Sequence, residues 1–300
     1  MQEAPVLRPL SVGDIIDRML RLFRANPVLF LGIAVLPDLI VEVLQRASGL
    51  SQTFDLNDFS SAFSTSAGRS ATLPRQFQQV NSGLALAVIV VALVFSVIQA
   101  GAMIEAIGQR YLGRAITVRE AYARGLRAVP RLVLCGIVVG VAFLAVFLVI
   151  AVALAVLNSS AAAAVAIILG LVGFFFLLPW ALLSLAVVGP VIVLEGLGPI
   201  AAIRRSLHLM DKARLRTLGL YVLVLIISAI LGLIFGVVFL ASFVSEPTLR
   251  SVLQATASVA SAAVSGPLLY GSIVILYYDL RVRKEAFDLQ LAAEALPREG

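Results

Sequence analysis

The chain is poor in the residues on which many catalytic and metal sites depend. Its 300 residues include one cysteine, Cys135, and one histidine, His208. A single cysteine excludes a disulfide framework and a thiolate metal cluster. There is no H-E-x-x-H, C-x-x-C or G-x-S-x-G pattern and no phosphate-binding Walker loop. We therefore expect no enzyme activity, no catalytic residues, no cofactor and no metal.

Charge is scarce as well, which excludes an ordinary soluble domain. Only 13% of residues are charged, 61% are hydrophobic and the mean hydropathy is +1.04, so too few polar residues exist to cover a soluble globule. Six apolar stretches are each long enough to cross a hydrocarbon core, which needs about 20 helical residues. The sequence predicts an all-α, polytopic integral membrane protein with six transmembrane helices, at 27–47, 83–108, 131–157, 163–194, 217–244 and 253–278.

The few basic residues are distributed unevenly between the two sides of the predicted spans. Nineteen Lys and Arg residues lie in the N-terminal segment, the second and fourth interspan segments and the tail, and four lie on the other side, at Arg46, Arg69, Arg75 and Arg250. Because cytoplasmic segments retain positive charge, both termini are expected in the cytoplasm. Topology thus explains the isoelectric point near 10, and we expect no nucleic-acid partner.

The three basic segments share a helix-start pattern. The first two place a carboxylate three residues after a hydroxyl residue, as in a capping box, and the third begins with glycine and proline. Apolar residues then follow at helical spacing, with arginines opposite them. The starts are Ser11 with Asp14, Thr117 with Glu120, and Gly198 with Pro199.

These starts indicate an internal repeat. Each unit would consist of a cytoplasmic amphipathic helix and a hairpin of two spans, at about 11–108, 117–194 and 198–278. We expect one membrane domain over 1–300, with a cytoplasmic tail at 279–300. Parallel repeats of this kind occur in transporters, but repetition does not establish transport.

The basic faces of these helices are candidates for binding anionic lipid headgroups or a membrane partner. An amphipathic helix can lie at the headgroup level, where each cation contributes about 1 kcal/mol. The alternative is that the helices only orient the next span and keep arginine because of topology. The candidate residues are Arg18, Arg21, Arg124, Arg127, Arg204 and Arg205.

Three carboxylates in the predicted spans, Asp38, Glu42 and Glu105, form a possible ion or proton site. Ionisable groups in the bilayer are costly and often mark a pathway. Asp38, Glu42 and Arg46 share one helix face, so a structural Glu42–Arg46 pair is the alternative. Glu105, and Glu195 near the same boundary, could equally pair with basic neighbours such as Arg110 and Arg204.

Several smaller patterns predict packing. Small residues at four-residue spacing, which allow close helix approach, occur at Gly136 and Gly140, at Ser228, Gly232 and Gly236, and at Ser258, Ala262 and Gly266. Tyr277 and Tyr278 at the end of the last span are typical of an interfacial belt. Asp279 with Arg281 and Arg283 is expected to anchor the tail.

Three stretches resemble a known family. RPLSVGDIIDRMLRLFRANP from Arg8, VIVLEGLGPIAAIRRSLHLM from Val191 and LYYDLRVRKEAFDLQ from Leu276 are similar to bacterial multi-span proteins labelled as the glycerophosphoryl diester phosphodiesterase membrane domain type. The resemblance covers nearly the whole chain and implies a bacterial inner-membrane location. A catalytic barrel of about 250 residues is not expected here, so the resemblance implies architecture and not the reaction.

Three functional hypotheses follow. The first is a non-enzymatic protein of the bacterial inner membrane that organises anionic lipid or a membrane partner complex, with a protein partner or a second copy as possible partners. The second is a transporter or channel subunit that uses the intramembrane carboxylates. The third is an auxiliary membrane domain for a separately encoded enzyme, such as a glycerophosphodiester phosphodiesterase.

Overall fold

The structure is a computed structural model that describes residues 10–48, 82–156, 168, 170, 172–236 and 246–286. Every regular element in these ranges is helical, and six helical segments are long and apolar enough to cross a membrane, as predicted. Arg8, Arg69, Arg75 and Arg298 lie outside the described residues, as does the predicted tail beyond residue 286. The elements are α1 (Val12–Ala25), α2 (Pro27–Ala47), α5 (Ser82–Tyr111), α6 (Val118–Val156), η2 (Gly173–Leu177), α8 (Leu178–Ser184), α9 (Val188–Leu194), α10 (Pro199–Met210), α11 (Arg214–Gly236) and α12 (Pro247–Glu285).

The predicted helix starts are confirmed. In α1 the Asp14 N–H donates to Ser11 Oγ at 3.2 Å, and the Ser11 N–H donates to the Asp14 carboxylate at 2.9 Å. This reciprocal pair satisfies two backbone donors that a helix start leaves free. The equivalent pairs join Thr117 and Glu120 before α6, and α10 begins at Pro199.

The second basic segment is not a separate helix, contrary to the expected unit of an amphipathic helix followed by a span. α6 runs without interruption from Val118 to Val156 through Pro130. By contrast, α1 ends at Asn26 before Pro27, and α10 ends before Lys212, whose φ of 59° is left-handed. Near Pro130, α6 has neither an asparagine cap nor a residue in the left-handed conformation, and proline is tolerated within membrane helices.

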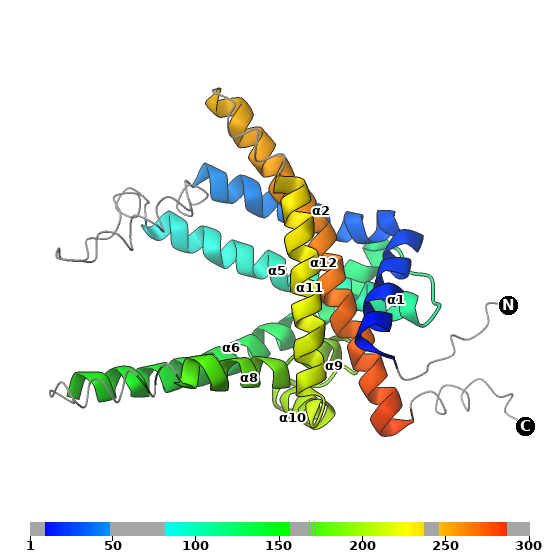
Figure 1. Ribbon diagram of the computed structural model, residues 1–300. Coiled ribbons are helices and arrows are strands. Elements are labelled where there is room, and N and C mark those ends of the chain that lie inside the picture. Colours follow the sequence, from blue (N-terminus) through cyan, green and yellow to red (C-terminus); the bar gives the residue numbers. More distant parts are fainter. Residues whose placement is uncertain are drawn as a thin grey trace, which may run out of the picture.

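Helices α5 and α12 form the centre of the bundle. α12 packs against α2, α5 and α11 and also contacts α1, α9 and α10, while α5 packs against α2, α6 and α9. Figure 1 shows α2 with α5, α6 with α8, and α11 with α12 leading away from a shared region in three directions. The most apolar stretch of α12 is 44% buried inside the protein and that of α6 only 6%, so α6 is the span most exposed to lipid.

The described glycines of the predicted small-residue stripes do not lie at close helix contacts. A Cβ added at Gly136, Gly140, Gly232 or Gly266 would meet nothing within 4 Å. The closest backbone approach instead joins α5 and α6, where a Cβ on Gly125 would lie 2.5 Å from the Ala102 nitrogen. Four-residue spacing of small residues shows that close helix packing is possible, but it does not show whether another helix packs there.

The interfacial-belt interpretation of Tyr277 and Tyr278 is wrong. Their exposed fractions are 0% and 4%, and the Tyr278 ring stacks on Tyr111 of α5 with centroids 5.2 Å apart. Since α12 is central, both sides of its C-terminal part are covered by other helices, and these rings pack inside the protein.

The Gly125 contact predicts a selective loss of stability. Gly125→Ala forces backbone atoms of α5 and α6 apart, and we expect a loss of about 1–3 kcal/mol, as for other overpacked sites. Thermal unfolding of the purified protein in detergent measures this as a lower midpoint. The matched control is Gly136→Ala, also in α6 but with open space around its Cβ, which leaves the midpoint unchanged or higher. Equal midpoints for the two variants would contradict the close approach.

Candidate functional site

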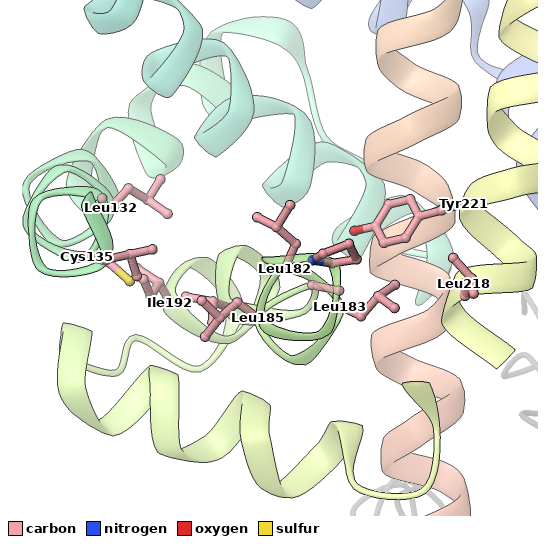
Figure 2. Close-up of a pocket in the computed structure, with 13 residues that line it drawn as sticks. Leu132, Cys135, Leu182, Leu183, Leu185, Ile192, Leu218 and Tyr221 are labelled. Atoms are coloured by element: carbon pink, nitrogen blue, oxygen red, sulfur yellow. The ribbon is translucent and has the colours of Figure 1, made fainter. Parts of the chain in front are cut away.

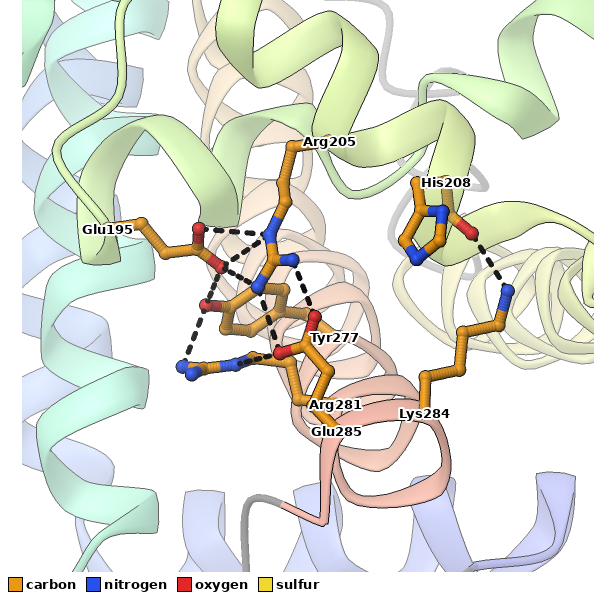
Figure 3. Close-up of polar contacts among 7 residues, drawn as sticks. All are labelled: Glu195, Arg205, His208, Tyr277, Arg281, Lys284 and Glu285. Carbon is orange, nitrogen blue, oxygen red and sulfur yellow. Dashed lines mark hydrogen bonds and ion pairs between the residues drawn. The ribbon is translucent and has the colours of Figure 1, made fainter. Parts of the chain in front are cut away.

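Polar side chains gather at one end of the bundle, which we call the base: residues 10–25, 105–131, 195–216 and 276–285. Arg205 of α10 lies between two carboxylates there, as Figure 3 shows. Its Nε is 3.1 Å from Glu195 Oε2, and a terminal nitrogen donates to Glu285 Oε2 at 2.9 Å. The hydroxyl of Tyr277 donates to Glu195 at 2.7 Å. One guanidinium thus joins the α9–α10 connection to the end of α12.

The electrostatics of this cluster favour its charged form. Burial opposes the charge of the guanidinium, but its hydrogen bonds to Glu285 and Glu195 and their negative charges outweigh burial and raise the pKa of Arg205. Glu195 therefore pairs with Arg205 and not with Arg204, the partner considered from sequence. α10 buries Ala202, Ser206 and Leu209, so Arg205 faces α12 while Arg204 points outward.

A second cluster at the base surrounds Asp279, whose side chain is fully buried. Its carboxylate accepts a hydrogen bond from the Leu10 N–H at 2.6 Å and pairs with Arg283 at 2.9 Å and with Arg216 of α11. Arg216 and Arg283 both also donate to the Leu10 carbonyl. Of the predicted tail contacts, Arg283 is confirmed, whereas Arg281 bonds to Glu285 and Tyr277 instead. The carboxylate joins both ends of the described chain.

Most of the arginines predicted to bind headgroups already have partners inside the protein. This holds for four of the six, and in addition to Arg205 the pairs are Arg18 with the Tyr111 hydroxyl at 3.0 Å, Arg21 with Asp17 at 2.9 Å and Arg124 with Glu105 at 3.6 Å. The Arg21 pair is exposed, with side-chain exposures of 65% and 60%, and contributes about 0–1 kcal/mol. Arg21 therefore remains available to a ligand at little cost.

Arg127 and Arg204 are different. Both are exposed, and neither forms a hydrogen bond or an ion pair within the ranges that the structure describes. Four carboxylates of the base pair with other residues: Glu105 with Arg124 and Gln109, Glu195 and Glu285 with Arg205, and Asp279 with Arg216 and Arg283. The positive charges of Arg127 and Arg204 are therefore not neutralised by these four carboxylates.

The three carboxylates proposed as an ion or proton site are not joined to one another by any hydrogen bond among the described residues. Glu42 pairs with Arg46 at 2.7 Å and accepts a hydrogen bond from Ser258 of α12 at 2.7 Å. Glu105 lies at the α5–α6 contact and, as above, pairs with Arg124; Arg110 bonds to a backbone carbonyl instead. Glu42 and Glu105 thus hold helices together.

Asp38 is the carboxylate that retains an unsatisfied atom. Its Oδ2 has no hydrogen-bond partner among the described residues, while Gln99 of α5 contacts the carboxyl group. Asp38, Gln45, Ser96 and Gln99 line a cavity of about 360 Å³ between α2 and α5 together with apolar residues. This cavity has the polar groups that a small polar ligand or an ion would need.

A larger apolar groove of about 640 Å³ lies between α6, the α8–α9 segment and α11. In Figure 2, Leu132 and Cys135 of α6, Leu182 and Leu185, and Leu218 and Tyr221 of α11 approach it from three sides. Its volume is within the range of about 300–1,000 Å³ usual for small-molecule sites. The remaining lining residues are Gly136, Val139, Pro179, Leu183, Ala186, Val188 and Ile192.

Sequence reasoning did not single out two arginines that lie within one turn of groove-lining residues. Arg131 directly precedes Leu132 and donates to the Gly196 carbonyl at 3.0 Å. Arg214, one turn before Leu218, donates to Ser184 Oγ at 2.9 Å and lies over the Trp180 ring at 4.6 Å. A signal was present, since each arginine lies at the start of an apolar span, but the groove forms only in the fold.

Nothing in the described ranges forms a group of three or more metal-ligating side chains, so no donor set for a metal can be assigned there. The only cysteine lies in the apolar groove, and His208 is exposed on α10. The arrangement offers cationic donors at the base and an apolar groove, two features that can bind a ligand with an anionic and an apolar part.

A family model described as a domain of unknown function (DUF7847) matches residues 10–280, and the chain therefore belongs to this family. The matched residues include Leu10 and Asp279, the two partners of the hydrogen bond described above. No curated protein and no solved structure matches the chain.

The Asp279 cluster predicts a large effect from a small change. Asp279→Asn keeps the side-chain volume but removes the charge that balances Arg216 and Arg283, and we expect a stability loss of about 3 kcal/mol, as for other broken buried ion pairs. Thermal unfolding in detergent, followed by the fluorescence of the single Trp180, measures it. The control is Asp17→Asn, which removes an exposed pair and changes stability by less than about 1 kcal/mol. A similar shift in both variants would refute the structural role of Asp279.

Proposed function

We propose that this member of the DUF7847 family binds anionic lipid headgroups at its base, as a non-enzymatic protein of the bacterial inner membrane. The observation that carries the proposal is the pair of exposed arginines, Arg127 and Arg204, that have no partner among the described residues. An exposed guanidinium at the membrane surface attracts anionic lipid by about 1 kcal/mol, and it binds a phosphate through two parallel N–H donors.

The charge balance of the base supports the proposal. The carboxylates of Glu195, Glu285 and Asp279 neutralise Arg205, Arg216 and Arg283, and none of them pairs with the outward-facing Arg127 and Arg204. α1 adds Arg21 in a weak exposed pair, and its opposite face buries Ile15, Ile16 and Met19. An amphipathic helix of this polarity suits the headgroup region.

We also propose that the base lies in the cytoplasm and that the chain is built from three repeats. The Leu10–Asp279 hydrogen bond supports a common side for both ends, and the 19 basic residues counted on that side favour the cytoplasm. The starts of α1, α6 and α10 at Val12, Val118 and Pro199 support the repeat, although in the second unit the basic helix and the span are one helix.

Native mass spectrometry of the detergent-purified protein tests the lipid function. With phosphatidylglycerol added, we expect the double variant Arg127→Gln, Arg204→Gln to bind about thirtyfold more weakly than the wild type, because two cations at about 1 kcal/mol each are lost. The matched control, Arg127→Lys with Arg204→Lys, keeps both charges and most of the binding.

The outcomes separate the lipid function from the partner-complex hypothesis. Equal retention of phosphatidylglycerol by the wild type and the double Gln variant would overturn headgroup binding at these residues. A protein partner that co-purifies with the wild type and is lost from the Gln variant, with no lipid retained by either, would favour the partner-complex hypothesis instead.

Asp38 supports a second candidate function, a transporter or channel subunit. The cavity of about 360 Å³ contains a carboxylate oxygen that has no hydrogen-bond partner among the described residues, a position often associated with ion pathways. Glu42 and Glu105 contribute less to this candidate, since both have structural partners. The auxiliary-domain hypothesis and the resemblance that suggested it remain predictions.

A flux measurement in proteoliposomes tests the second candidate. If Asp38 carries an ion or proton, Asp38→Asn abolishes pH- or cation-driven flux while the protein remains monodisperse. The control Asp17→Asn removes an exposed carboxylate of α1 and leaves flux unchanged. Absence of any flux in the wild type, or equal flux in all three proteins, would exclude this role for Asp38.

A further inference from the structure

The apolar groove exists because the fourth span is interrupted. η2 is a turn of π-helix, and the chain leaves helical geometry between Ser184 and Val188, which separates α8 from α9. α8 then packs against α11 and α10, whereas α9 packs against α5, α6 and α10. The two halves of the span follow different neighbours, and the space between α6 and α8 is left open as the groove.

Interrupted helices inside a membrane often line binding sites. Backbone that leaves helical geometry at membrane depth is tolerated where it is buried or lines a cavity, and π-turns within helices are frequent at functional sites. Here Leu185 and Ala186, at the interruption, line the groove directly. Discontinuous spans form the binding sites of many membrane proteins.

Two arginines of the described chain adjoin the groove-lining residues on their helices. On α6 the order away from the base is Arg131, Leu132 and Cys135, and on α11 it is Arg214, Leu218 and Tyr221. Both arginines therefore lie at the base end, on opposite walls. Neither forms an ion pair in the part of the chain that the structure describes; their donors reach a carbonyl and a hydroxyl.

We infer that the groove is a binding site for one anionic phospholipid, with an acyl chain between α6, α8 and α11 and the phosphate at Arg131 and Arg214. The inference rests on the proposed lipid function and adds to it a defined site and ligand class. An apolar slot with two cations at its membrane-surface end matches the two ends of such a lipid. A neutral apolar ligand would leave both guanidiniums without an anion.

The chain offers a matched pair of variants. Gly136 lines the groove, whereas Gly140, one turn further along α6, does not, and a Cβ at either position meets nothing within 4 Å. Gly136→Phe fills the groove without changing any charge, and Gly140→Phe places the same ring on α6 outside it. Because each chain methylene displaced weakens binding severalfold, we expect Gly136→Phe to bind phosphatidylglycerol about tenfold more weakly than Gly140→Phe in native mass spectrometry.

A photocrosslink on the wild-type protein gives a second, independent measurement. Phosphatidylglycerol with a diazirine in one acyl chain is expected to label peptides that contain residues 132–139 and 179–188, and phosphatidylcholine with the same chain is expected to label them less. This result does not depend on the folding of a variant. Labels spread evenly over the exposed faces of α6 and α11 would overturn the inference.

The outcomes distinguish the groove from the headgroup function. If Gly136→Phe retains the lipid but the Arg127 and Arg204 variant loses it, the groove inference fails and the proposed function stands. Equal binding of phosphatidylglycerol and phosphatidylcholine, both lost in Gly136→Phe, would overturn the anionic ligand class. A dimer that is lost in Gly136→Phe, without bound lipid, would show a second copy as the occupant and overturn the inference.

Discussion

The buried carboxylate of Asp279 is the interaction on which the rest of the base depends. It has no contact with solvent and binds the backbone of Leu10, Arg216 of α11 and Arg283 of its own helix. Lipid gives little hydrophobic reason for apolar helices to associate, so polar contacts that require a partner determine where the spans converge. Together with the Arg205 cluster, Asp279 connects α1, α10 and α11 to α12 and holds both ends of the described chain at one place.

The same requirement divides the arginines into two classes. Those that face α12, such as Arg205 and Arg216, neutralise buried carboxylates and have no capacity left for a ligand. Those that face outward, such as Arg127 and Arg204, are exposed and form no ion pair among the described residues. The proposed binding of anionic lipid depends on this division, because the carboxylates pair with arginines where desolvation makes pairing necessary.

Open space in the bundle follows from the interrupted fourth span. A straight, uninterrupted fourth span could pack along α6, as α5 does. Instead α8 and α9 contact different neighbours, and α6 keeps exposed apolar side chains such as Leu144 and Phe147 along its outer half. The groove and the Asp38 cavity differ in character: the first is apolar with cations at its end, while the second is narrower and contains a carboxylate.

The sequence by itself determined what depends on near neighbours: six apolar spans, the capping boxes at Ser11 and Thr117, and the pairs Glu42–Arg46 and Asp279–Arg283, whose members lie one turn apart. Only the tertiary structure decided that Arg205 and not Arg204 pairs with Glu195, and that Tyr277 is buried. It also decided that α5 approaches α6 closely at Gly125 and not at Gly136. The position of Arg131 and Arg214 at one end of a groove likewise depends on the fold. Periodicity shows which face of a helix a residue occupies. Which other helix covers that face depends on contacts between residues far apart in the chain.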